Sequence, residues 1–283
     1  MAASLSKQRT IGKIGNYVLL VVASVLMFAP LYYLFIGSLK PTEKVLNGFA
    51  GFLPSDLTFK NYIGVFSSLS SDATGYFAQY FFNSIWISLV VVLGGLVINS
   101  MAGYAFARLE WFGRDKIFIL VILLVIVPFE SVAVPLMAIM SGMRDTLLVQ
   151  MLPFLANAMS IFLFYTFFLN LPKSVEEAAT LDGLGPWGTY FRIIVPNAKP
   201  VFATVSILTF LSSWGNFLWP ALMITDPGTR PLPLEMTVFS AQTPPDWGLV
   251  FAFGVLLVLP VLIVFLVFQR FFIQSVAGSA VKG

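Results

Sequence analysis

Residues 84–105 read SIWISLVVVLGGLVINSMAGYA, a run without a single charged side chain. A helix needs about 20 apolar residues to cross the hydrocarbon core of a bilayer. The apolar residues follow one another without a break, whereas a strand of a membrane barrel would alternate apolar with polar residues. The stretch therefore predicts a transmembrane helix.

The composition of the whole chain agrees with a membrane protein. Of its 283 residues, 58% are hydrophobic and 10% are charged, whereas an ordinary soluble domain has about 25% charged residues. A soluble protein of this size cannot bury so much apolar surface in one core. The chain has no Cys and no His, which excludes disulfides, Cys/His zinc sites, thiolate nucleophiles and imidazole acid–base chemistry.

Five further runs resemble the first, so the sequence predicts an all-α polytopic membrane protein with six transmembrane helices. The run nearest the N-terminus, residues 17–36, follows Lys7, Arg9 and Lys13, as the apolar part of a signal peptide would. It is too long for a signal peptide, and no small-residue cleavage site follows it. We expect it to be retained. The predicted spans are residues 17–36, 84–105, 117–140, 147–169, 202–224 and 249–268.

Six spans place both termini on the same side of the membrane. Eleven of the 16 Lys and Arg residues lie on that side and five on the other. The positive-inside rule therefore places the termini in the cytoplasm. We expect a cytoplasmic N-terminal segment over 1–16, a six-helix membrane domain over 17–268 and a cytoplasmic tail over 269–283.

Proline residues interrupt several of these runs. Proline removes a backbone hydrogen bond and kinks a helix. Two interpretations are open: ordinary packing of bent helices, or a bundle that bends around a pathway. The residues are Pro128, Pro135, Pro153, Pro220 and Pro260.

The predicted cytoplasmic loop 170–201 is too long to be a simple connector. Its residues 171–200 read LPKSVEEAATLDGLGPWGTYFRIIVPNAKP. We expect a first short helix with Ser174 as N-cap and Glu177 completing a capping box, which Gly183 and Gly185-Pro186 would end. A second short helix would follow over Trp187–Val195 and end at Pro196.

Both helices are too short to be stable alone and need a surface to pack on. From the local residues, two interpretations are equally open. The loop packs against the base of its own bundle, or it docks on another protein. The bulky side chains that offer a docking surface are Leu181, Leu184, Trp187, Tyr190 and Phe191.

The spacing of this loop resembles a known signature. Glu177-Ala178-Ala179, then Gly183, nine residues, and Ile193-Ile194-Val195-Pro196 is similar to the EAA---G---------I-LP motif of permease subunits of bacterial ATP-binding-cassette importers. Val195 stands where the motif has Leu. We call residues 170–201 the coupling loop from here on.

Further stretches extend the resemblance along the chain. Residues 213–220, SWGNFLWP, resemble the SWNxFLWP run of carbohydrate-importer permeases, with Gly215 as a departure. Residues 54–62 and the tail from Gln269 to Gly283 resemble the maltose-permease G-type subunits of CUT1-type sugar importers. The resemblance implies the type I importer permease fold.

The resemblance also implies partners and roles. The chain would form half of the pathway in a heterodimer with a second permease, in the bacterial inner membrane and among its lipids. Two ATPase subunits would bind ATP and Mg, so this chain needs no cofactor and is not an enzyme. A solute-binding protein would deliver the sugar, and no nucleic acid is expected. The implied ATPase-coupling residues are Glu177, Ala178, Ala179, Asp182, Gly183, Leu184 and Pro196.

For some of these residues two roles are open. Glu177 would bond a basic group of the ATPase as well as cap its helix, and Asp182 would cap the second helix or face the ATPase. Gly183 would permit a turn too tight for a side chain. The tail after Arg270 would also lie against the ATPase pair.

Candidate pathway residues are fewer. Glu130 is the one ionisable residue deep in a predicted span, where a charge is costly and faces protein or water. It would contact a sugar hydroxyl or a cation, be a structural partner, or lie nearer the outer interface if Pro128 breaks the helix there. Asn83, Asn157, Asn216 and Trp219 have the chemistry that holds sugars, but amides within spans also join helices.

The external loop 225–248 carries Phe239 and Trp247, and it either reaches toward the binding protein or is a solvated connector. An ion-coupled secondary transporter is the alternative function. Such carriers usually place several polar groups at mid-membrane in inverted repeats, and the sequence has one carboxylate and no clear repeat. The solute stays open among sugars and related compounds.

Overall fold

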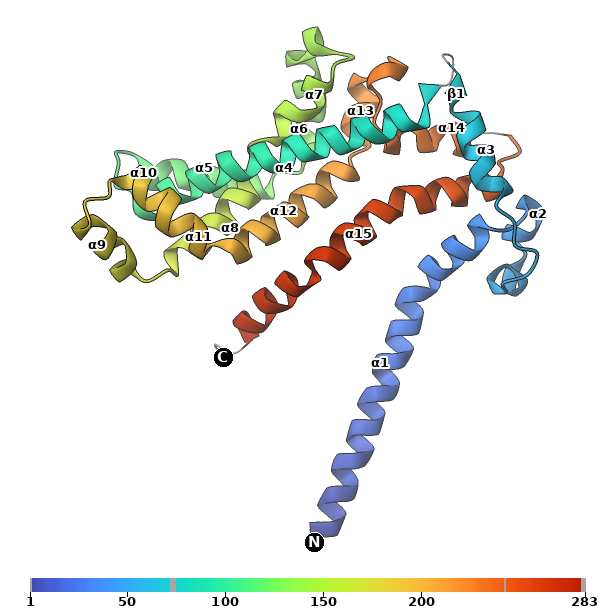
Figure 1. The fold of residues 1–283 in the computed structure, drawn as a ribbon, viewed down its shortest axis with the longest axis horizontal. Helices are drawn as coiled ribbons and strands as arrows, with labels where there is room; N and C mark the ends of the chain where they lie inside the picture. The colour runs from blue at the N-terminus through green and yellow to red at the C-terminus, as the bar shows by residue number, and fades with distance from the viewer. Residues whose placement is uncertain (1, 72–74, 242, 281–283) are drawn as a thin grey trace. The chain divides into compact units, whose positions relative to one another are not determined.

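The computed structural model describes residues 2–71, 75–241 and 243–280 and is 79% helical. This confirms the predicted all-α class. The two longest helices are the first and the last in the sequence, so both ends of the described chain are helical (Figure 1). The α-helices are α1 Ala2–Ser38, α2 Thr42–Val45, α3 Lys60–Ser68, α4 Phe77–Arg108, α5 Arg114–Ile126, α6 Phe129–Ile139, α7 Leu147–Met151, α8 Ala158–Leu169, α9 Lys173–Leu181, α10 Pro186–Thr189, α11 Val195–Asn197, α12 Lys199–Trp214, α13 Leu218–Met223, α14 Met236–Ser240 and α15 Trp247–Ala280.

Shorter elements connect them. A π-helical turn, η4, covers Tyr190–Ile194 between α10 and α11, and two strands of two residues, β1 Ser70–Ser71 and β2 Gly75–Tyr76, pair with each other. The 3₁₀ turns are η1 Gly48–Phe52, η2 Ser141–Met143, η3 Leu152–Phe154, η5 Pro227–Thr229 and η6 Leu232–Glu235.

Among the described residues, three unbroken helices are long and apolar enough to cross a membrane: Gly15–Ser38, Phe77–Arg108 and Trp247–Phe268. Three bent helix pairs would raise the number to six if each pair is one span. The pairs are Arg114–Ile126 with Phe129–Ile139, Leu147–Phe154 with Ala158–Leu169, and Pro186–Asn197 with Lys199–Trp214. Six spans therefore stay a prediction.

Proline explains the sharpest break. The expectation of one continuous helix over 117–140 is wrong, because α5 and α6 meet at 105°. Pro128 cannot donate a backbone hydrogen bond, and it disfavours helical geometry in the residue before it. Val127 is accordingly extended, with ψ 114°. Glu130, expected deep in the helix, lies in the first turn of α6.

Two further predicted spans with internal prolines are also interrupted, whereas α1 and α15 continue through Pro30 and Pro260. The helix expected over 147–169 bends by 41° between η3 and α8. The helix expected over 202–224 is divided into α12 and α13, because α12 ends at Trp214 and Gly215 is its C-cap. Residues 215–217 thus separate two shorter helices where the sequence predicted one.

The chain divides into two compact units, which we describe separately. The first comprises residues 1–70 and 236–258. Its polar centre is Lys40, whose buried ammonium donates to the backbone oxygens of Ala50 (2.7 Å) and Gly51 (3.0 Å). Asn61 donates to the backbone oxygens of Ser38 and Lys40, both at 2.8 Å. These bonds fix the segment that follows α1.

The second unit comprises residues 71–235 and 259–283. In it α8 and α12 run alongside α4 (Figure 1). Gly103 permits this packing, because a Cβ there would lie 2.6 Å from the Cβ of Phe164. Small residues at such contacts let membrane helices approach closely. The coupling loop follows α8 and leads into α12.

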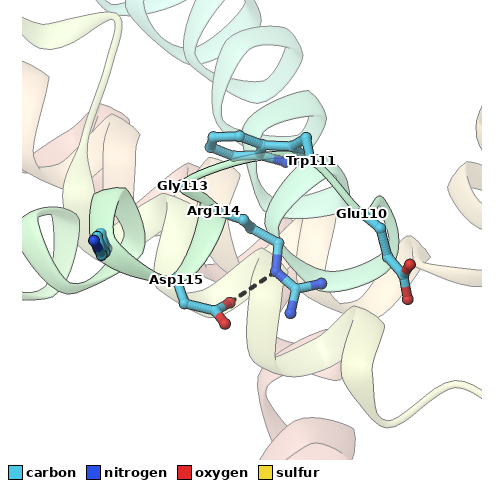
Figure 2. Close-up of a pocket in the computed structure, with 6 residues that line it drawn as sticks. Glu110, Trp111, Gly113, Arg114 and Asp115 are labelled. Carbon is cyan, nitrogen blue, oxygen red and sulfur yellow. Dashed lines mark hydrogen bonds and ion pairs between the residues drawn. The ribbon is translucent and has the colours of Figure 1, made fainter.

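Residues 109–113 form a short turn between α4 and α5. It ends at Gly113, and the guanidinium of Arg114 donates to the Asp115 carboxylate at 2.8 Å. Figure 2 shows these side chains around a pocket of about 320 Å³, with Glu110 at its edge. Phe112 is fully exposed in this turn.

Candidate functional site

The first helix of the coupling loop begins two residues earlier than predicted. α9 starts at Lys173, its N-cap is Pro172, and among the described residues no side chain caps it. Ser174 therefore lies inside the first turn, and the predicted capping box is wrong. Pro172 ends the preceding segment and fixes the entry geometry itself. As a consequence, Glu177 is not committed to capping.

The end of α9 has the geometry that the sequence predicted. The amide of Leu184 donates to Ala179 O at 2.9 Å, and the amide of Gly183 donates to Thr180 O at 3.0 Å. Together these are the two bonds of a Schellman motif. Gly183 has φ +79°, and a Cβ there would meet no atom within 4 Å. Glycine is favoured because of this left-handed backbone, so the turn disfavours a side chain through its backbone conformation rather than through lack of space.

The second half of the loop is more wound than predicted. α10 begins with Pro186 at its first turn, and the chain continues through η4 into α11, past the predicted end at Pro196. The amide of Val195 donates to Tyr190 O, a π-type bond. Pro196 itself is exposed. Asp182 is the C-cap of α9 and is exposed, so it does not cap α10, whose N-cap is Gly185.

The coupling loop has an outward and an inward set of side chains. Leu181 is 90% exposed, an unusual state for a large apolar residue. Trp187 and Phe191 are also exposed, and their rings stack with centroids 6.2 Å apart. Ala179 is buried, whereas Glu177 and Ala178 are exposed. Leu184 is half-buried.

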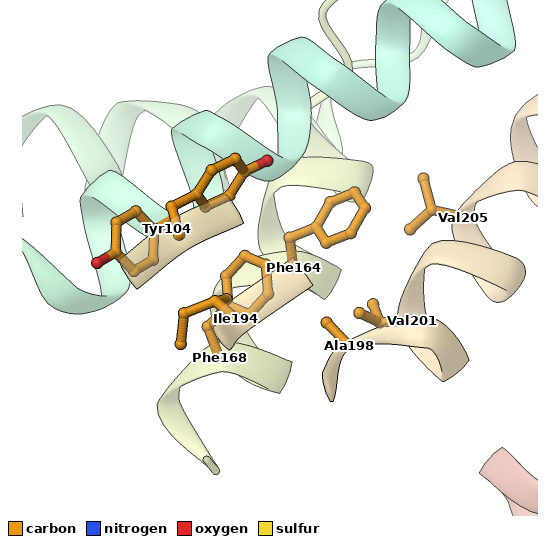
Figure 3. Packing of buried hydrophobic residues seen from close by; sticks show 8 residues of the cluster. Tyr104, Phe164, Phe168, Ile194, Ala198, Val201 and Val205 are labelled. Carbon is orange, nitrogen blue, oxygen red and sulfur yellow. The ribbon is translucent and has the colours of Figure 1, made fainter. Parts of the chain in front are cut away.

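Tyr190 points inward, so its predicted place on the docking surface is wrong. Its side chain is buried, and its hydroxyl pairs with that of Ser100 on α4 at 2.6 Å. The ring also packs on Tyr104 with centroids 5.2 Å apart. The reason is the cluster beneath it, which takes residues from α4, α8, η4 and α12 (Figure 3). The cluster comprises Tyr104, Phe164, Phe168, Tyr190, Ile194, Ala198, Val201 and Val205.

Two adjacent glutamates of α9 have different surroundings. Glu176 lies 3.1 Å from the Nε of Arg108, the last residue of α4. The Arg108 side chain is 5% exposed and that of Glu176 is 22% exposed. Glu177 is turned to the exposed side. The sequence analysis did not single out Arg108. Its only signal was a basic residue immediately after a long apolar run.

The coupling loop therefore combines a fixed base with an exposed polar and aromatic rim. The base is held by the Tyr190–Ser100 bond, the Arg108–Glu176 pair and the apolar cluster. A cavity of about 520 Å³ lies between α4 and α10, lined by apolar atoms of Tyr104, Trp187 and neighbouring residues. Such a surface is suited to binding another protein, because exposed aromatic anchors contribute most at interfaces.

The candidate pathway residues do not come together. Glu130 is exposed in α6, without a hydrogen bond or ion pair to the described residues. Asn157 is exposed and caps α8 by accepting from the amide of Ser160 at 2.9 Å. The backbone N–H of Asn157 donates to the side-chain oxygen of Asn99, and the side-chain nitrogen of Asn99 donates to Leu155 O. Asn99 thus provides hydrogen-bond partners for backbone groups at the break between η3 and α8, a role that the sequence did not reveal.

Asn216 and Trp219 have structural contacts. The Trp219 side chain is completely buried, and its indole N–H donates to Val149 O at 2.8 Å. The Asn216 side-chain oxygen lies 3.4 Å from the Trp219 amide. Trp219 packs with Val149, Met223 and Ile224 between α7 and α13. A side chain enclosed in this way is not available to a sugar.

We expect Trp219→Ala to lower stability rather than solute affinity. Large-to-small changes at a buried Trp cost about 3–5 kcal/mol, which corresponds to a drop of at least about 5 °C in melting temperature for a protein of this size. A thermal-unfolding assay on the detergent-solubilised protein measures it. Phe217→Ala, at a half-exposed ring on the same segment, is the control. Equal melting temperatures for both variants would contradict the assignment.

The last candidate, Asn83, holds the segment 225–235. Its side-chain amide donates to the backbone oxygens of Gly228 and Arg230, both at 3.0 Å. The side-chain amide of Gln79 donates to Gly228 O, and that of Gln150 donates to Thr229 O, each at 2.9 Å. The segment is therefore tied to α4 and α7 and is not a loose connector. Further along, Phe239 is buried against Phe253, so it cannot reach outward.

Asp145 is the second anchor of this segment. Its carboxylate accepts from the amides of Asp226 and Thr225 and from the Thr225 hydroxyl. These bonds favour the charged form and hold the pKa of Asp145 below its ordinary value of 3.8. In the same segment, burial raises the pKa of Glu235, and the paired Arg230 guanidinium at 3.3 Å opposes that rise.

The lowered pKa of Asp145 predicts an acid dependence of this segment. A depressed folded-state pKa contributes stability that is present above the unfolded value and is lost as the pH falls through the folded one. We expect hydrogen exchange at Thr225 and Asp226, corrected for intrinsic rates, to stay protected down to about pH 4. Protection is then lost below the ordinary value of 3.8.

Asp145→Asn is the matched change at neutral pH. It removes the charge from these hydrogen bonds, and charge-assisted bonds are about twice as strong as neutral ones. We expect at least roughly fivefold faster exchange at the two amides. Unchanged exchange in this variant, or loss of protection starting near neutral pH in the native chain, would refute the role of Asp145.

The predicted tail 269–283 falls largely outside the described side chains. α15 extends to Ala280, but nothing is described of the side chains from Gln269 onward. The expected contacts of the tail after Arg270 therefore stay a prediction.

Comparison with known proteins agrees with this architecture. A family model described as "Binding-protein-dependent transport system inner membrane component" matches residues 95–278. An arabinooligosaccharides transport system permease protein of Halalkalibacterium halodurans is 34% identical over 90% of this chain and 91% of its own. A lactose transport system permease protein of Rhizobium radiobacter is 29% identical over 96% and 97%.

A solved structure has the same fold. It is a bacterial ABC transporter involved in the import of the acidic polysaccharide alginate, and one of its chains superimposes with a TM-score of 0.78. The identity is 24%, and the match covers 93% of this chain and 96% of that one. The likeness supports the predicted permease fold.

Proposed function

The chain belongs to the family of inner membrane components of binding-protein-dependent transport systems, and on this premise we propose how its coupling loop drives the import of a carbohydrate. It is a transmembrane subunit of a sugar importer powered by an ATP-binding cassette. The family is a transport permease rather than an enzyme. The relatives named above import an arabinooligosaccharide and lactose, so oligosaccharides and disaccharides are the proposed substrate class.

The coupling loop carries this proposal. Its base is fixed to α4 and α8, and its rim exposes Glu177, Leu181 and Trp187. We propose that this rim docks in a cleft of one ATPase subunit, with Glu177 paired to a basic group there. When ATP closes the ATPase dimer, the cleft moves and the docked loop displaces the helices attached to it.

The importer needs further subunits. A permease of a binding-protein-dependent importer implies a partner permease, ATPase subunits and a solute-binding protein. The sequence has no phosphate-binding GxxxxGK[ST] loop, so we propose that two ATPase subunits bind the ATP and Mg. The second permease supplies the other half of the pathway. We propose that both termini and the coupling loop face the cytoplasm.

The opposite face would receive the binding protein. The segment 225–235 is held by Asn83, Asp145 and Gln150, so it offers a preformed surface there. Pathway contacts are proposed for Glu130 and Asn157, whose side chains are exposed in this chain. The Asn157 oxygen caps α8, so we propose its side-chain nitrogen as the group that faces the second permease or the solute.

Transport in sealed vesicles tests the proposal. The purified complex should contain an ATPase and a second permease, and its ATP hydrolysis should rise when the loaded binding protein is added. Uptake should depend on ATP inside the vesicle and stay the same when ion gradients are collapsed. Uptake that follows an ion gradient without ATP would favour the alternative, an ion-coupled secondary transporter.

A further inference from the structure

Arg108 occupies a junction between three helices. It is the last residue of α4, and its Nη2 donates to the backbone oxygens of Phe168 and Leu171, both at 2.6 Å. Its Nε lies 3.1 Å from the Glu176 carboxylate. The three partners belong to the end of α8, the link that follows it, and the first turn of α9. One guanidinium thus spans the joint between α8 and α9 from the side of α4.

Each of these contacts is electrostatically favourable. The last carbonyl groups of a helix carry partial negative charge and attract cations, while the first turn of a helix attracts carboxylates. Phe168 is in the last turn of α8, Leu171 lies in the link that follows, and Glu176 is in the first turn of α9. Arg108 is largely buried, so these interactions are screened less than surface pairs.

α9 has little else that holds it at this end. Within Lys173–Leu181, Ala179 is the one buried residue, and Leu181 at the far end is almost fully exposed. The Tyr190–Ser100 bond attaches η4, which lies after Gly183, and does not reach α9 directly. α9 also contacts α10 and η4, which follow it, so the Arg108–Glu176 pair is the contact that attaches its first turn to α4.

From this geometry we propose that Arg108 is a positioning residue for energy coupling: it locks α9 to α4 so that movement of the docked loop reaches α4 as well as the flanking α8 and α12. The proposal rests on the proposed function of the coupling loop. A freely swinging α9 would absorb the displacement of the ATPase cleft, whereas a locked one transmits it.

Lysine is not equivalent at this position. Its ammonium is a compact point charge, whereas the planar guanidinium presents donors in a fixed fork. In Arg108 one nitrogen, Nη2, donates to both carbonyl oxygens while a second, Nε, lies 3.1 Å from the carboxylate as an ion pair. The guanidinium thus serves these groups from two separate nitrogens, whereas lysine has only one. Removing one partner of a buried ion pair also leaves the other charge uncompensated. Arg108→Lys should therefore rescue only part of the function lost in Arg108→Gln.

The test uses the assembled importer in proteoliposomes with the loaded binding protein. We expect Arg108→Gln to lower the number of solute molecules imported per ATP hydrolysed by about tenfold. Glu176→Gln should give a similar loss, and the double variant should be no worse than either single one, as expected for residues that act as one unit. Arg114→Gln is the matched control, since Arg114 pairs with its neighbour Asp115 at 2.8 Å on the same turn.

A distance measurement separates positioning from general destabilisation. The chain has no native Cys, so spin labels can be placed at Thr180→Cys and Phe112→Cys, both exposed sites. The labelled chain with native Arg108 must keep stimulated turnover. We expect the distance distribution to broaden in Arg108→Gln complexes recovered in normal amount. If Arg108→Gln assembles poorly, Glu176→Gln answers the same question, because it leaves both carbonyl bonds in place.

The outcomes are distinct. Native transport per ATP and a native distance distribution in Arg108→Gln and Glu176→Gln would overturn the proposal. If Glu177→Lys still uncouples the importer in that case, the proposed function stands and only the role of Arg108 fails. If the purified native chain brings down no ATPase, the proposed function itself fails.

Discussion

Glu177→Lys is expected to abolish the stimulation of ATP hydrolysis by the loaded binding protein. Glu177 is exposed on α9, free of the capping role that the sequence predicted, while its neighbour Glu176 is occupied by Arg108. Reversing its charge against a basic group on the ATPase replaces an attraction with a repulsion. Losing one partner of a desolvated pair costs about 2–5 kcal/mol, so stimulated turnover and transport should fall at least roughly 30-fold. Purified complex in proteoliposomes measures both quantities.

Glu110→Lys is the control for this charge reversal. Glu110 is also an exposed carboxylate, but it lies on the turn between α4 and α5 (Figure 2). We expect native stimulation in this variant and normal membrane insertion in both. Stimulated turnover at the native rate in Glu177→Lys would contradict the role assigned to the loop.

Leu181→Asp is expected to release the ATPase from the complex. Leu181 is 90% exposed in this chain, and water-exposed leucine gains about 1.5–3 kcal/mol when it is buried. If it fills the ATPase cleft, the aspartate loses that gain and brings a charge that must be desolvated. Retention of the ATPase should weaken roughly 10- to 100-fold. Titrating purified ATPase onto the permease pair in nanodiscs gives the affinity directly.

The matched control for this substitution is Phe112→Asp. It places the same charge at a fully exposed apolar residue outside the coupling loop. Affinity for the ATPase should stay native in this variant. Equal weakening in both variants would show that added negative charge, rather than loss of the Leu181 contact, causes the effect.

Features that depend on a few consecutive residues were predictable from the sequence. The end of α9 at Gly183 follows from local backbone geometry, and the Schellman bonds confirm it. The second helix was expected from Trp187 and begins one residue earlier, at Pro186, because proline is favoured in the first turn of a helix. The long α4 follows from an uninterrupted apolar run.

Features that depend on tertiary contacts were not predictable in this way. Ser174 has the pattern of an N-cap, but Pro172 starts the helix before it. Tyr190 looks like a docking residue until the aromatic cluster places it against Ser100 and Tyr104. Trp219 has sugar-binding chemistry, yet burial between α7 and α13 assigns it to packing. For Tyr190 and Trp219 a distant segment decides the role of the side chain, whereas for Ser174 a competing local signal, Pro172, does.

The most direct measurement of the central claim is a crosslink from Leu181. The chain has no native Cys, so Leu181→Cys can carry a single photoreactive group in intact membranes. The account predicts a covalent adduct between this chain and an ATPase subunit, and no reaction of the thiol with an impermeant reagent added outside the cell. A thiol that is labelled from outside and yields no ATPase adduct would contradict it.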